Sequence, residues 1–440
     1  MTRPRPLNFW VGVLACVACA GVAVTFAQRR DVFVASRDHP AIAYARGPVS
    51  DPIFQLNRRI QDGTLRLQFD RTGGNGYLRS VLAALDIPIE SQTLVFSETS
   101  LEAKLINPRN PRAVFFGDTV SVGWVRGSDT LELAAQDPVQ GVIFYTLPQA
   151  PSDKPKLTRD DSCLACHLSW DTLGVPGFFV LSTFPMSDDK NAYANGFVAD
   201  HRSTLADRWG GWYVTGRPGP LRHMGNVPVI VHGKPDPQAP RSPVLASLDG
   251  RFDTKAYLSP LSDIVALMVL EHQTQTTNLM TRMGWEARLA AHARSNPAGS
   301  TPRQRDDAAA RVRETASDLV DYLLFLDEAP MAGAIRGSSG FAEKFSSQGP
   351  RDGKGRSLRQ LDLDRRLMRY PCSYMIYTPA FDALPQDAKG AVYQRMWQIL
   401  SGRETGTRYA VLSRADRQAI VEILRETKKD LPAYFQLVTR

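Results

Sequence analysis

Residues 112–147 of the chain read RAVFFGDTVSVGWVRGSDTLELAAQDPVQGVIFYTL. Short runs rich in β-branched and aromatic residues alternate with the turn-forming groups Gly117-Asp118 and Gly127-Ser128-Asp129, a pattern typical of strands joined by tight turns. We therefore expect a small antiparallel β meander. Its strands are expected at residues 113–116, 120–125, 131–135 and 142–147. The aromatic residues of these runs are expected in the core: Phe115, Trp124, Phe144 and Tyr145.

The chain after this meander is mainly helical in pattern. Ser259-Pro260 is a strong helix start, with Ser as N-cap and Pro as the first helical residue. Apolar residues then recur at steps of three and four as far as about Ala291, which predicts a long helix. Further helices are expected at residues 306–326, 386–400 and 413–428. The fold class is thus α+β, with an antiparallel β meander in the first half and a mainly helical C-terminal part.

Shorter patterns give local expectations elsewhere. Asp51-Pro52 is expected to cap and open a short helix. The alternation over Leu65–Phe69 predicts a strand, and Tyr374–Tyr377 is expected to be another. Residues 31–50 are expected to form an extended linker.

The chain divides into four expected regions. Residues 1–30 form a targeting segment, and residues 31–150 an N-terminal α+β region with the meander. Residues 151–250 form a region of aromatic and Gly-rich loops, and residues 251–440 the mainly helical region. A chain of 440 residues is long enough for two or three domains.

The first thirty residues have the pattern of an export signal. Arg3 and Arg5 precede the uncharged, mostly apolar run of residues 7–27, and Arg29-Arg30 follow it. The run is long enough to span a bilayer, so it predicts either a cleaved signal peptide or an uncleaved membrane anchor. In both cases the bulk of the chain is exported. The net charge of +8 comes without any nucleic-acid-binding motif, so we expect no nucleic-acid partner.

The strongest chemical motif follows the meander. Cys163-Leu164-Ala165-Cys166-His167 is a Cys-x-x-Cys-His sequence, the pattern by which a haem is attached covalently. The two thiols and the adjacent imidazole lie on one short segment, so all three can reach the same flat macrocycle. A zinc site would need four ligands, and no second Cys-x-x-Cys is present. A dithiol redox motif would need a strand-to-helix junction that opens a β-α-β unit, and Pro-rich sequence precedes this motif instead.

Cys163, Cys166 and His167, together with the export signal, resemble a c-type cytochrome. The resemblance implies one covalent haem c, with thioethers at the two cysteines and His167 as the proximal iron ligand. The resemblance extends to the chain around them, which looks like large, single-haem, cytochrome c-like exported proteins of bacteria whose function is mostly unassigned. It implies a location on the periplasmic side of the bacterial inner membrane, either free or anchored through residues 7–27.

The residue opposite His167 is the open question of the sequence, because a closed iron site favours electron transfer and an open one permits peroxide or oxygen chemistry. The distal candidates are His272, inward on the long helix, and His223, Met224 and His201 in a segment rich in Trp and Gly. We expect electron transfer with a periplasmic or membrane redox partner. The alternatives are a haem peroxidase or oxygenase with an open distal site, or a haem redox sensor.

Overall fold

The computed structural model describes residues 36–98, 100, 102–183, 196–227, 244–404 and 406–435. The expected targeting segment, residues 1–30, lies outside the described residues. Within the part of the chain that is described, no helix is both long enough and apolar enough to cross a membrane.

The described residues form a seven-stranded antiparallel sheet in the order β6-β5-β4-β3-β2-β1-β9. A two-stranded antiparallel ribbon, β7-β8, lies beside it. The strands are β1 (Thr93–Val95), β2 (Arg112–Phe116), β3 (Val120–Trp124), β4 (Thr130–Asp137), β5 (Gly141–Pro148), β6 (Thr158–Arg159), β7 (Val180–Thr183), β8 (Gly196–Ala199) and β9 (Trp212–Tyr213). The predicted meander is confirmed as β2 to β5, and its four aromatic residues are all buried.

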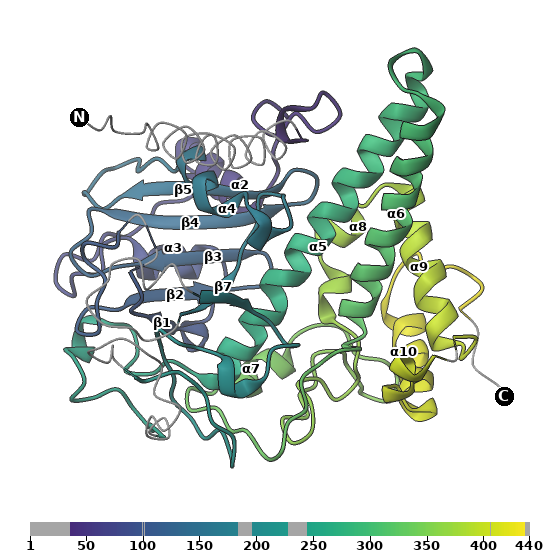
Figure 1. The fold of residues 1–440 in the computed structure, drawn as a ribbon. Coiled ribbons are helices and arrows are strands. Elements are labelled where there is room, and N and C mark those ends of the chain that lie inside the picture. Colours follow the sequence, from purple (N-terminus) through teal and green to yellow (C-terminus); the bar gives the residue numbers. More distant parts are fainter. Residues whose placement is uncertain are drawn as a thin grey trace, which may run out of the picture.

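Side chains alternate between the two faces of this sheet, as the pleat requires. One face packs against the helices α2 (Pro52–Gln61) and α3 (Leu78–Ala84), which lie behind the sheet in Figure 1. The strand residues on this face include Phe115, Val122, Leu131, Leu133 and Leu147. The opposite face carries Val114, Gly123, Glu132 and Phe144, and it is the face on which the Cys-x-x-Cys-His segment lies.

Helices make up most of the C-terminal half, which confirms the α+β class (Figure 1). The helices from α4 onward are α4 (Leu164–His167), α5 (Ile264–Ser295), α6 (Pro302–Leu323), α7 (Phe341–Ser347), α8 (Pro379–Asp382), α9 (Gln386–Leu400) and α10 (Arg414–Thr427). The long helix α5 stands between the sheet and the helices α6, α8, α9 and α10 (Figure 1). Its start is a correction: Asp263, not Ser259, is the N-cap, because its carboxylate accepts the N–H groups of Val265 and Ala266.

Both isolated strand predictions were wrong. Leu67 is buried as the alternation over residues 65–69 suggested, but the backbone there bonds elsewhere: the Gln68 N–H donates to the Ser80 hydroxyl, so no ladder forms. Residues 374–377 form a 3-10 turn, because the Ser373 side chain caps it at the Met375 N–H. The helix predicted after Asp51 is confirmed as α2.

The linker expected at residues 31–50 is not extended where it is described. Residues 36–38 form a helical turn, and Ile42 and Tyr44 are buried against the sheet. The Tyr44 hydroxyl donates to the Val142 carbonyl at 2.6 Å. This segment is therefore part of the first hydrophobic core.

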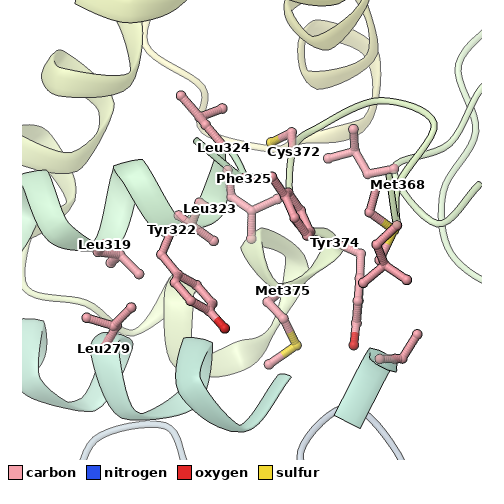
Figure 2. Packing of buried hydrophobic residues seen from close by; sticks show 14 of the residues in the cluster. Leu279, Leu319, Tyr322, Leu323, Leu324, Phe325, Met368, Cys372, Tyr374 and Met375 are labelled. Carbon is pink, nitrogen blue, oxygen red and sulfur yellow. The ribbon is translucent and has the colours of Figure 1, made fainter. Parts of the chain in front are cut away.

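The described residues form two hydrophobic cores, one between the sheet and its N-terminal helices and one among the C-terminal helices. Figure 2 shows part of the second core, where Leu279 of α5 lies against Leu319 of α6. Residues 151–250 contribute to both cores: Val175 belongs to the first, and Val180 and Trp209 to the second. The region boundaries proposed from the sequence stay predictions.

Candidate haem-attachment site

The Cys-x-x-Cys-His segment forms a compact double turn at the edge of the sheet. The Asp160 carboxylate accepts the Ser162 N–H at 2.9 Å and starts a 3-10 turn that ends at Cys163. Helix α4 follows as a single turn, and its first residue, Leu164, is buried. Cys163 is half-buried, Cys166 is exposed, and both are free thiols. The local fold therefore places both thiols and the His167 ring within one turn, as the spacing predicted.

Hydrogen bonds to the backbone fix the His167 ring. Its Nδ1 lies 2.9 Å from the Gly177 carbonyl oxygen, and the Gly177 N–H donates back to the His167 carbonyl at 3.0 Å. Because a carbonyl only accepts hydrogen bonds, Nδ1 carries the proton and Nε2 keeps its lone pair. Burial lowers the His167 pKa to about 4, so the ring is neutral at neutral pH. The ring stacks on Phe179, with the centroids 5.0 Å apart.

A cavity of about 370 Å³ opens beside this segment, and Cys163, Cys166 and His167 all line it. It lies between the free face of the sheet, β7 and α5, which contributes Leu270 and Thr274. The volume is in the range usual for cofactor sites. Much of its lining is apolar, from Val114, Phe144, Phe178, Val180, Leu270 and Trp212. A cavity of this kind fits a flat, mostly apolar ring attached at the two thiols.

One ion pair lies on the sheet side of the cavity. The Arg112 guanidinium crosses above Gly123 on the neighbouring strand and reaches Glu132 at 2.5 Å on the strand beyond. A Cβ at Gly123 would lie 2.6 Å from Arg112 Nε, so the glycine makes room for the arginine. Sequence reasoning missed this pair, since only the strand register brings the two residues together.

The pKa of the Cys163 thiol is raised to about 11, first by burial and then by the nearby carboxylates of Asp160 and Glu132.

None of the four distal candidates is among the described residues that line this cavity. His272 points away from it, with Nδ1 2.8 Å from His201 Nδ1 and Nε2 2.7 Å from the Ser373 hydroxyl. His223 is buried against Trp209, and its Nδ1 accepts the Gly225 N–H. The described lining contains no Met and no His other than His167. From the Trp- and Gly-rich segment, Trp212 reaches the cavity.

The other readings of the motif have little support in the geometry. Among the described residues, no group of three or more His, Cys, Asp or Glu side chains is arranged to hold a metal ion. Strand β6 before the motif is an antiparallel edge strand of two residues, so the motif does not open a β-α-β unit. Haem attachment remains the interpretation that uses both thiols and the imidazole together.

Comparison of the chain with protein-family models, with curated proteins and with solved structures found no match.

Proposed function

We propose that this chain is an exported c-type cytochrome that carries one covalent haem and acts in electron transfer. Cys163 and Cys166 would form the thioethers, and His167 would be the proximal ligand of the iron. A haem held there supplies a one-electron ferric/ferrous couple. The proposed location is the periplasmic side of the bacterial inner membrane, with residues 7–27 as a cleaved signal or as an anchor.

A single observation carries this proposal: both thiols and the His167 ring line the same cavity, with Nδ1 of the ring already bound to the Gly177 carbonyl. Ligating histidines usually donate their second N–H to a carbonyl or carboxylate, which fixes the ring and its tautomer. A pair of cysteines that only exchanges disulfides does not need a neighbouring histidine held in this way.

The exposed side of the segment suits exchange of electrons with a partner. Cys166 is exposed, and the Trp170 residue, three positions after His167, is 66% exposed. A haem bound to Cys166 would have one edge near this surface. A periplasmic or membrane-bound redox protein is the proposed partner.

The second candidate is a haem enzyme of the peroxidase or oxygenase type. The observation that favours it is the lining of the cavity, whose described residues include no second His and no Met but do include the Arg112–Glu132 pair. An open sixth position beside charged side chains permits chemistry on a small ligand. The redox sensor stays a third reading, with no observation of its own.

Two measurements test the proposal. Intact mass and the alkaline pyridine spectrum of the exported protein are expected to show one covalent haem c per chain; an unmodified mass after expression with a haem-attachment system would refute haem attachment. Carbon monoxide added to the ferrous protein then separates the roles. An unchanged spectrum supports the electron carrier, and a shifted spectrum supports the open-site enzyme.

A further inference from the structure

The outer surface of α2, α3 and the loop between them carries an excess of positive charge. Residues 52–84 contain five arginines and two aspartates, and no lysine, histidine or glutamate. All five arginines are exposed, and we call the surface that they form the basic face: Arg58, Arg59, Arg66, Arg71 and Arg79. Helix α6 carries four arginines against five acidic residues. The excess on the basic face is therefore not a general property of the surface helices.

The two aspartates of this stretch are held by their own turns. The Asp62 carboxylate accepts the Thr64 N–H at 3.0 Å and the Thr64 hydroxyl at 2.7 Å. The Asp70 carboxylate accepts two backbone N–H groups of the turn that follows it. Hydrogen bonds from Thr64 lower the pKa of Asp62 first, and the charges of Arg58 and Arg59 lower it further. In the described part of the chain, however, none of the five arginines forms an ion pair.

Hydrogen bonds tie the three parts of the basic face together. The Leu65 N–H donates at 2.9 Å to the carbonyl of Arg59, near the end of α2. The Gln68 N–H donates at 2.9 Å to the hydroxyl of Ser80, the neighbour of Arg79 on α3. The loop between the helices is therefore fixed beside both of them, and the five arginines belong to one continuous surface.

The basic face lies on the opposite side of the sheet from the attachment segment. Helices α2 and α3 cover one face of the sheet, behind it in Figure 1, and the Cys-x-x-Cys-His segment lies on the other face. A partner that covers the basic face therefore leaves the attachment segment open.

The chain before residue 36 can keep a membrane close to this surface. The expected membrane run ends at residue 27, nine residues before residue 36, which is the first described residue. Nine residues span at most about 30 Å when they are fully extended. If the run stays in the bilayer, the described part of the protein therefore remains beside the lipid headgroups.

We infer that the basic face binds the headgroups of a bilayer that contains anionic phospholipids. The planar guanidinium group of arginine matches a phosphate with two parallel hydrogen bonds. Each arginine close to an anionic bilayer strengthens binding by about fivefold. The inference rests on the export of the chain in the proposed function, but not on haem attachment. A protein bound in this way carries its attachment segment on the side away from the membrane, where a soluble periplasmic redox partner reaches it.

Co-sedimentation of the full exported protein with two kinds of vesicle tests the inference. One kind is phosphatidylcholine alone, and the other contains about one third phosphatidylglycerol. The ratio of the two partition coefficients reports the effect of lipid charge, because the uncharged run of residues 7–27, where it is retained, enters both kinds. We expect a ratio of at least about a hundred for the wild type at low salt, and a ratio near one in about 1 M salt.

A triple variant of the basic face, Arg58→Gln/Arg66→Gln/Arg79→Gln, should lower this ratio by about a hundredfold, because three of the five cations are lost. The matched control, Arg303→Gln/Arg313→Gln/Arg403→Gln, removes the same charge from exposed positions in the helical half. Its ratio should stay within about threefold of the wild type.

Three results would overturn the inference: a wild-type ratio near one, a triple variant of the basic face that keeps the wild-type ratio, or equal losses in the two variants. Equal losses would show that only the net charge of the protein matters. Intact mass of the same samples reports signal cleavage and haem attachment separately, so a failure of the proposed function can be told apart from a failure of lipid binding.

Discussion

His167 and His272 use their ring nitrogens in opposite ways. In the cavity at the sheet, His167 uses Nδ1 in a hydrogen bond to the Gly177 carbonyl and keeps the lone pair on Nε2. On the long helix α5, His272 uses both ring nitrogens in hydrogen bonds, one to His201 and one to Ser373. A histidine with one uncommitted nitrogen is ready to bind a metal, whereas a histidine with two committed nitrogens holds elements of the fold together. Burial lowers the pKa of both rings, but His272 is fully buried whereas His167 is only partly buried.

The largest effect is expected at the two thiols. The double variant Cys163→Ala/Cys166→Ala should lose covalent haem completely, because no thiol remains to form a thioether at the cavity. Intact mass and a haem stain of the denatured protein measure the loss. Cys372→Ala is the control: Cys372 is fully buried away from this cavity, and its variant should keep the haem. If both variants kept it, the attachment site would lie elsewhere.

The pair His272→Ala and His167→Ala tests the contrast between the histidines directly. His272→Ala removes two buried hydrogen bonds and leaves a void, so it should lower the free energy of unfolding by about 3 kcal/mol. The iron spectrum of the haem-loaded protein should not change. His167→Ala should change that spectrum, because it removes the proposed ligand. Urea unfolding and visible spectra give both readouts, and a lost low-spin band in His272→Ala would reverse our assignment.

The buried neutral histidines should make the fold sensitive to acid. Burial lowers the pKa of His272 to about 3 and that of His223 to about 4, whereas the unfolded chain takes up these protons near pH 6.5. Each residue's contribution is complete above pH 6.5 and is lost as the pH falls toward the folded value, by roughly 1.4 kcal/mol per pH unit. His223→Asn keeps an acceptor for the Gly225 N–H but does not titrate. Urea unfolding at pH 6.5, 5.5 and 4.5 should show that the free energy of unfolding falls less steeply with pH in this variant than in the wild type. Equal falls in the two proteins would contradict the lowered pKa of His223.

The smallest effect is expected at Gly123. An added Cβ would meet the Arg112 guanidinium, which is flexible enough to move aside, so Gly123→Ala should cost only about 1 kcal/mol of stability. Moving Arg112 should nevertheless shift the reduction potential of the haem, since a positive charge leaves its place beside the cavity. Gly390→Ala on α9, where a Cβ meets nothing within 4 Å, is the control for both measurements. An unchanged potential would place Arg112 outside the electrostatic reach of the iron.

Sequence patterns were most reliable where the local chain decides the structure. The four strands of the meander were found from their turns, and α9 was predicted at its observed bounds. The helix predicted at residues 413–428 is α10, and it begins at a capping box of Ser413 and Asp416. The attachment turn was predictable for the same reason, because Cys163, Cys166 and His167 are neighbours in sequence.

What the sequence missed depends on contacts between distant segments. The periodicity of α5 correctly placed His272 toward the interior. However, α5 is buried on nearly all sides between residues 264 and 281. An inward direction therefore could not tell whether His272 faces the cavity at the sheet. The Arg112–Glu132 pair depends on the register of three strands. The partner of His201 lies 71 residues away in the sequence, where no spacing rule applies.

The strand order of the sheet implies an order of events as the chain is made. Strands β1 to β5 pair with their neighbours in sequence, so this part of the sheet can form from local hairpins alone. The attachment segment follows β5 and β6 directly, whereas β9, which closes the far edge against β1, comes much later. If synthesis and export proceed from the N-terminus, the cysteines emerge beside a sheet that lacks only β9, while the helix α5 that closes the cavity is still absent. We therefore expect the thiols to be most accessible to a modifying enzyme on nascent chains, before α5 docks.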